Sequence, residues 1–202
     1  MHGPGRRLAT ACAATAVTLT AWSEAGATDL WGGLYAHDIE DGLSEGGVEE
    51  GPQLAAGVIG RRLQSLQRLG APSPYALAAL NTQGGTSYAA AGLSWRVGLG
   101  ERLYLRPALG AAVHDGETDL PSPYAPGLAD VTRSQRFQRG QDELDLGSRV
   151  LVHLELALGW RANDQWAVEA SWMHLSHGDL AGDQNPGLSD LGVRLVYSFG
   201  ER

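Results

Sequence analysis

The stretch VLVHLELALGW at residues 150–160 decides the fold. Its even-numbered positions are Val, Val, Leu, Leu, Leu and Trp, whereas its odd-numbered positions include His153, Glu155 and Gly159. Successive side chains of an extended strand point to opposite faces, so this segment predicts a strand with one apolar face and one partly polar face.

The same period of two recurs along the chain. We expect eight strands, at residues 30–37, 53–61, 74–81, 87–97, 103–113, 150–160, 166–176 and 191–199. A soluble β-sandwich would also alternate, because one face of each of its sheets meets water. The even number of segments, their length of about 10 residues and their aromatic ends favour a membrane barrel. We therefore predict an all-β protein, an eight-stranded antiparallel outer-membrane β-barrel.

The first residues have the composition of an export signal rather than of a fold. Arg6 and Arg7 precede a small-residue apolar run at 8–21, which is too short to span a bilayer. Residues 25–27 (Ala-Gly-Ala) offer a small-x-small cleavage site. We expect residues 1–27 to be a signal peptide and the protein to be exported to the bacterial outer membrane.

The remaining residues, 28–202, are expected to form one barrel domain. The lone cysteine, Cys12, lies in the signal segment, so neither a disulfide nor thiol chemistry is expected in the mature chain. After residue 27 no run is long and apolar enough for a helical membrane span. The formal net charge of -8 argues against a nucleic-acid partner.

The connections alternate in length and so predict the orientation of the barrel. Short turns are expected at 98–101 and 161–164, and long polar loops at 38–52, 115–147 and 177–188. In outer-membrane barrels the short turns face the periplasm and the long loops face outward. The strand at 166–176 therefore ends at the outer surface.

Candidate chemistry lies at that outer end, in the sequence WMHLSH at residues 172–177. His174 and Ser176 alternate onto the apolar face of the strand, with Val168, Ala170 and Trp172. In a membrane barrel this face looks at lipid, which is where a lipid-cleaving site has to be.

These residues carry a resemblance to a known family. The His-x-Ser pair is followed by Asn-Pro-Gly at 185–187 and by a last strand that ends at Phe199, and the early segment WGGLYAHD at 31–38 is similar to the first strand of many members. An exported eight-stranded chain with these features resembles the PagL-type lipid A 3-O-deacylases, often called acyloxyacyl hydrolases. The resemblance implies an outer-membrane serine esterase that removes an ester-linked acyl chain from lipid A, with lipopolysaccharide as its substrate.

The roles that the resemblance implies follow hydrolase chemistry. Ser176 would be the nucleophile and His174 the base that takes its proton and returns it to the departing sugar hydroxyl. No cofactor is implied.

The chain departs from the family at two positions. Where members carry the Glu that orients the histidine, this chain has Ser189, which shares the lipid face. Asp190 has the right chemistry but points toward the lumen by strict alternation, unless a bulge near Gly187 turns it outward. His177 replaces the Asn that commonly follows the family serine, which leaves Asn185 as the candidate donor to the oxyanion.

The inward positions predict the filling of the lumen. A charge network is expected there, formed by Glu155, Glu169, Arg96, Arg106 and Arg194. His37, His114 and His177 are read as loop or lumen residues, because no two of them have a tight metal-ligand spacing. The charged segment 115–145 is read as a solvated external loop.

Two other functions remain open from the sequence. A non-enzymatic eight-stranded barrel, used for adhesion or envelope integrity, fits if the missing Glu marks lost activity and if His174 and Ser176 are only interfacial polar residues. An acyltransferase would need an inner acyl pocket, which the inward Arg and Glu disfavour.

Overall fold

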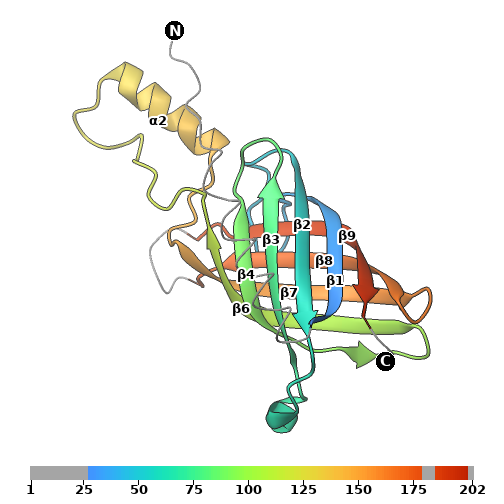
Figure 1. Cartoon of the computed structure of the whole chain (residues 1–202). Helices are drawn as coiled ribbons and strands as arrows, with labels where there is room; N and C mark the ends of the chain where they lie inside the picture. The colour runs from blue at the N-terminus through green and yellow to red at the C-terminus, as the bar shows by residue number, and fades with distance from the viewer. Residues whose placement is uncertain (1–26, 179–184, 200–202) are drawn as a thin grey trace.

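The computed structural model describes residues 27–178 and 185–199, and they form a closed antiparallel β-barrel (Figure 1). Of the predicted signal peptide, only Ala27 falls within these residues, as the first residue of β1. The strands are β1 (Ala27–Ala36), β2 (Pro52–Gly60), β3 (Ser73–Asn81), β4 (Tyr88–Ser94), β5 (Val97–Gly98), β6 (Leu103–His114), β7 (Val150–Arg161), β8 (Trp166–Ser176) and β9 (Leu188–Ser198).

Each strand pairs with its neighbour along the chain, and the pairing of β1 with β9 closes the barrel. β4 and β5 both pair with β6, so they are two parts of one strand that is interrupted at Trp95 and Arg96. The barrel therefore has eight strands, as the alternation predicted.

The alternation of side chains also holds in the structure. On β7, Leu156, Leu158 and Trp160 face outward and are about half exposed, whereas His153 and Ala157 face inward and are fully buried. An outward band of Leu and Val of this kind is unfavourable in water, because removal of apolar surface from water is the dominant favourable contribution to folding. The band therefore suits an apolar surrounding such as lipid.

Charged side chains fill the lumen, as expected from the inward positions. Arg194 pairs with Glu155 at 2.5 Å and with Glu169 at 2.6 Å, and Arg106 pairs with Glu169 at 3.0 Å. The guanidinium of Arg96 lies 3.7 Å from the centre of the Tyr104 ring. The predicted network is confirmed for its other four members, which are Glu155, Glu169, Arg106 and Arg194. Arg96 contacts the network through the ring of Tyr104.

The two ends of the barrel differ. The connections 37–51, 82–87 and 115–149 lie at one end, the long-loop end, as do residues 177–178 and 185–187. The connections 61–72, 99–102 and 162–165 lie at the other end, the short-turn end. Figure 1 shows α2 (Asp130–Asp142) projecting beyond the long-loop end and η1 (Gln64–Leu69) projecting beyond the short-turn end.

The helix α2 differs from the expectation for this segment, which was a solvated external loop. It buries none of its residues, so it carries no apolar periodicity by which it could have been recognised. Arg139 and Glu143 pair along its last turn at 2.7 Å. In the described part of the chain, no helix is long and apolar enough to cross a membrane.

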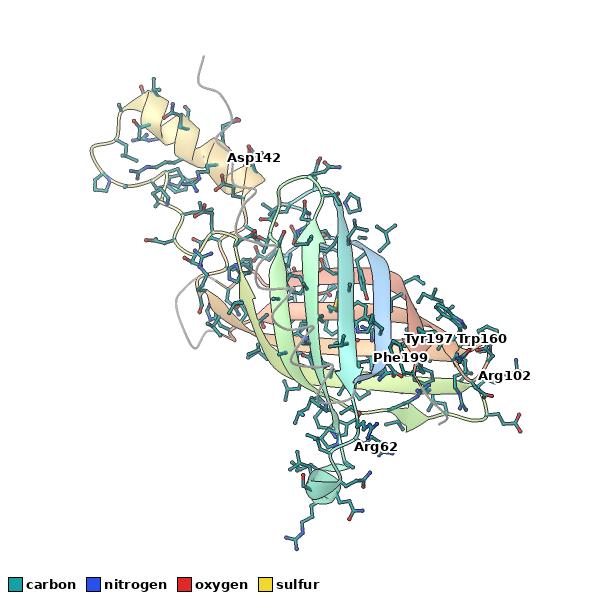
Figure 2. The ribbon with its side chains drawn as sticks, viewed as in Figure 1. Arg62, Arg102, Asp142, Trp160, Tyr197 and Phe199 are labelled. Carbon is teal, nitrogen blue, oxygen red and sulfur yellow. The ribbon has the colours of Figure 1, made fainter. Side chains whose placement is uncertain are left out.

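Aromatic side chains gather at the short-turn end. Figure 2 labels Trp160, Tyr197 and Phe199 at that end. The ring of Tyr197 lies 4.8 Å from that of Trp166 and 5.0 Å from that of Phe199, measured between centroids. Such a girdle is typical of the level at which a barrel meets the membrane interface.

Candidate active site

His174 lies on the outward face of β8, near the long-loop end. It is opposite Leu154 on β7 and Ser189 on β9. Trp166 and Val168, which face outward further along the same strand, are 39% and 40% exposed, but His174 is only 3% exposed. Residues beyond the strand therefore cover it.

Three neighbours fix the imidazole of His174. Its Nδ1 is 2.9 Å from the Oγ of Ser189. The ring stacks on the indole of Trp172, with 5.7 Å between centroids and 7° between planes. Gly187 approaches from the other side: a Cβ at that position would lie 2.9 Å from the Cε1 of His174. Nδ1 thus faces a hydroxyl, and Nε2 is the ring nitrogen that Ser189 does not hold.

Ser176 lies two residues further along the same face, at the end of β8, and is half-buried. The structure thus brings the two predicted residues to one face at the long-loop end. Among the described residues no hydrogen bond joins them directly. Catalytic hydrogen bonds commonly tighten only when substrate is bound.

The two candidates for the third member separate cleanly. The pairing of β8 with β9 is unbroken from Trp166 to Leu175, so the alternation continues without a bulge. Asp190 therefore points into the lumen, where its carboxylate lies 2.8 Å from both His37 Nδ1 and Tyr88 Oη. The alternative in which a bulge near Gly187 turns Asp190 outward as the catalytic carboxylate is therefore wrong, and Ser189 is the residue that faces His174.

Asn185, the predicted oxyanion donor, lies just before Gly187. Its Oδ1 accepts a hydrogen bond of 3.1 Å from the backbone N–H of His177. The side-chain amide is thereby oriented with its NH₂ group pointing away from that contact.

The loop 37–51 covers the site. The sequence predicted a long polar loop here but gave no sign that it lies over His174. The backbone N–H of Ile39 donates to the carbonyl of Ser189 at 2.8 Å. The N–H of Glu45 donates to Pro186 O at 3.1 Å, and the hydroxyl of Ser44 donates to Gly187 O at 3.3 Å. The loop is thus fastened to the segment that leads into β9.

Asp41 is the residue of this loop that reaches the site. Its Oδ1 accepts the backbone N–H groups of Leu43 and Ser44, at 2.7 Å and 2.9 Å, and its Oδ2 accepts the indole N–H of Trp172 at 2.7 Å. Partial burial acts to raise the pKa of Asp41, but hydrogen bonds from Leu43, Trp172, Ser189 and Ser44 outweigh it, so the pKa is lowered. Asp41 therefore remains a carboxylate at neutral pH.

His37, at the start of the same loop, ties it to the lumen. Its Nδ1 and Nε2 lie 2.8 Å from Asp190 and 3.0 Å from Glu49. Burial acts to lower the pKa of His37, but hydrogen bonds to the two carboxylates raise it to about 9. His37 is thus a charged link between the loop and the barrel. No group of three or more His, Cys, Asp or Glu within residues 27–178 and 185–199 has the arrangement of a metal site.

Comparison with known families gives the chain its place. The model of the lipid A 3-O-deacylase (PagL) family matches residues 78–198. This chain belongs to the PagL family. The matched span covers His174, Ser176 and Ser189, but it begins after the loop 37–51 that carries Asp41.

Solved structures agree with the family on the fold. The crystal structure of the outer membrane enzyme PagL is similar with a TM-score of 0.53 at 12% identity, over 85% of this chain and 99% of that chain. Neisserial surface protein A has a TM-score of 0.48 at 10% identity, over 85% and 96%. Ail of Yersinia pestis has 0.42 at 14%, over 86% and 99%. A search of curated proteins by sequence found no match. The chain has the fold that the alternation predicted, an eight-stranded antiparallel β-barrel like that of outer-membrane barrels.

Proposed function

We propose that this protein is an outer-membrane serine esterase that removes an ester-linked acyl chain from lipid A. The observation that carries the proposal is the placement of His174. Its Nδ1 is held by Ser189 at 2.9 Å, and it shares the outward face at the long-loop end with Ser176. Membership of the PagL family supports lipid A as the substrate.

The chemistry follows from these positions. A serine hydroxyl is a weak nucleophile until a base takes its proton. Nε2 of His174 would take the proton of Ser176 as the hydroxyl attacks the ester carbonyl, and would then return it to the departing sugar hydroxyl. The acyl group would pass to Ser176, and water activated by the same histidine would release it as a fatty acid.

Oxyanion support would come from Asn185. Because its Oδ1 accepts the N–H of His177, its NH₂ group is the part able to donate to the negative oxygen of the tetrahedral intermediate.

The surroundings of the site suit a substrate that stays in the membrane. The outward residues below His174 are apolar, and Val168 and Leu191 are 40% and 50% exposed. Acyl chains of lipid A could lie along this face while the sugar ester sits at the level of His174. The lumen, in contrast, holds the charged side chains of Arg194, Glu155 and Glu169, which disfavour an inner acyl chain.

The proposal predicts that Ser176→Ala and His174→Ala each lower deacylation about 10⁴-fold or more, because a nucleophile and its base act as a unit. The measurement is mass spectrometry of lipid A from cells that make the wild-type protein or a variant. Loss of one acyl mass is expected only with the wild type.

A matched control keeps assembly apart from chemistry. Heat-modifiable gel mobility of the membrane fraction should be the same for the wild type and both variants. Full deacylation by Ser176→Ala would refute the nucleophile. Unchanged lipid A with a correctly assembled wild-type barrel would instead favour the non-enzymatic barrel.

A further inference from the structure

The neutral Ser189 leaves a chemical gap at the site. An oriented histidine base is normally stabilised by a carboxylate on its Nδ1 side, which holds the tautomer and the positive charge that forms during the reaction. A serine hydroxyl alone does neither, because it can donate to Nδ1 as readily as accept from it.

The contacts of Ser189 continue beyond His174, to a carboxylate. Asp41 lies two residues after Ile39, whose backbone N–H donates to the carbonyl of Ser189 at 2.8 Å. A hydrogen bond from the Ser189 hydroxyl is among the causes that lower the pKa of Asp41, and the same hydroxyl oxygen lies 2.9 Å from Nδ1 of His174. Ser189 therefore lies between the imidazole and a carboxylate that comes from a different part of the chain.

The single hydroxyl proton of Ser189 sets the direction of the hydrogen bonds that run from His174 through Ser189 to Asp41. A hydroxyl has one proton to donate, and a carboxylate can only accept. When Ser189 donates to Asp41, its lone pairs face Nδ1, which must then carry a hydrogen. Nε2 is left with the lone pair that a base needs.

Trp172 contacts both Asp41 and His174, the two ends of this hydrogen-bond series. Its indole N–H donates to Asp41 Oδ2 at 2.7 Å, and its ring stacks on the imidazole of His174. The other oxygen of Asp41 is fixed by the backbone N–H groups of Leu43 and Ser44. These contacts fix the position of the Asp41 carboxylate, which therefore does not depend on the Ser189 hydroxyl alone.

We infer that Asp41 is a positioning residue that acts on His174 through Ser189, in place of the carboxylate that the family carries directly on the strand. This inference rests on the proposed function for its catalytic consequence. Its structural content, the tautomer of His174, is independent of activity and can be measured by itself.

The first test reads the tautomer. Protein labelled with ¹⁵N-histidine is folded in detergent micelles, and the signals of His174 are assigned by their loss in His174→Gln. At a pH where the ring is neutral, the wild type should carry hydrogen on Nδ1 and none on Nε2. Asp41→Asn and Ser189→Ala should each reduce or reverse this preference. Hydrogen on Nε2 in the wild type, or no change in Asp41→Asn, would overturn the inference.

The second test is kinetic. Asp41→Asn should lower kcat for deacylation about 10²-fold with little change in KM, a smaller loss than for a directly bonded carboxylate because the effect passes through a hydroxyl. The double variant with Ser189→Ala should be no slower than the slower single variant. In the Asp41→Asn background, Ser189→Glu should restore much of the rate by placing a carboxylate directly on Nδ1.

Glu40→Gln is the matched control, since Glu40 is an exposed carboxylate beside Asp41 in the sequence. It should leave both the tautomer and the rate unchanged. A switch of tautomer in a protein that releases no acyl chain would defeat the proposed function but not the role of Asp41. Wild-type rates and an unchanged tautomer in Asp41→Asn would defeat that role alone.

Discussion

At the scale of single residues, the site depends on close packing around one imidazole. Gly187 has a φ of +71°, and a Cβ there would lie 2.8 Å from the carbonyl oxygen of Leu43 and 2.9 Å from Cε1 of His174. Glycine is thus required twice, for the left-handed backbone and for the space between the loop 37–51 and the histidine. The Asn-Pro-Gly sequence before β9 has a physical role in seating the base.

Gly187→Ala should therefore lower deacylation about 10²-fold while the barrel still assembles, because the methyl group displaces His174 from its position. Gly47→Ala is the matched control: its φ is +76° and a Cβ there meets nothing within 4 Å. Both variants share a backbone cost of about 1–2 kcal/mol. Equal deacylation rates for the two, measured on lipid A, would show that crowding of His174 is unimportant.

At the scale of elements, the sequence predicts what is local. The period of two correctly placed Ser189 outward and Asp190 inward, since alternation depends only on neighbouring residues. It could not find Asp41, because this loop residue meets Trp172 only when β1 and β9 pair and close the barrel. The sequence around Asp41 predicts a long polar loop, and nothing in it indicates the strand to which this loop is fastened.

The loop 37–51 should also be sensitive to pH through His37. Its pKa of about 9 in the folded protein exceeds the ordinary value of 6.5, so its stabilisation is fully present below about pH 6.5 and is lost as the pH rises through 9. The shift corresponds to on the order of 3 kcal/mol. Denaturant unfolding in detergent should show this loss in the wild type and a flatter profile in His37→Gln. Parallel profiles would mean that Glu49 and Asp190 do not hold His37 in its charged form.

At the scale of the whole molecule, different interactions stabilise the two faces of the barrel: apolar side chains on the outer face and ion pairs on the inner face. Outside, Leu and Val side chains make an apolar band, whereas inside Arg106 and Arg194 form ion pairs with Asp29, Glu155 and Glu169. The alternation showed which residues point inward but not which of them pair, because three of the four pairs join strands that are not consecutive in the chain. The same paired charges leave the lumen closed and confine any lipid chemistry to the outer face.

Arg194 is the centre of this network, since it is buried and pairs with both Glu155 and Glu169. Arg194→Met should lower the free energy of unfolding by about 3–5 kcal/mol, because it leaves two carboxylates buried with one fewer partner. Adding Glu169→Gln should recover part of the loss by removing one of those charges. Arg68→Met, in the exposed η1, is the control and should change stability little. The measurement is urea unfolding of the barrel in lipid vesicles, followed by tryptophan fluorescence. If Arg194→Met matched Arg68→Met, the lumen charges would be solvated by water rather than by one another, and the closed interior would have to be abandoned.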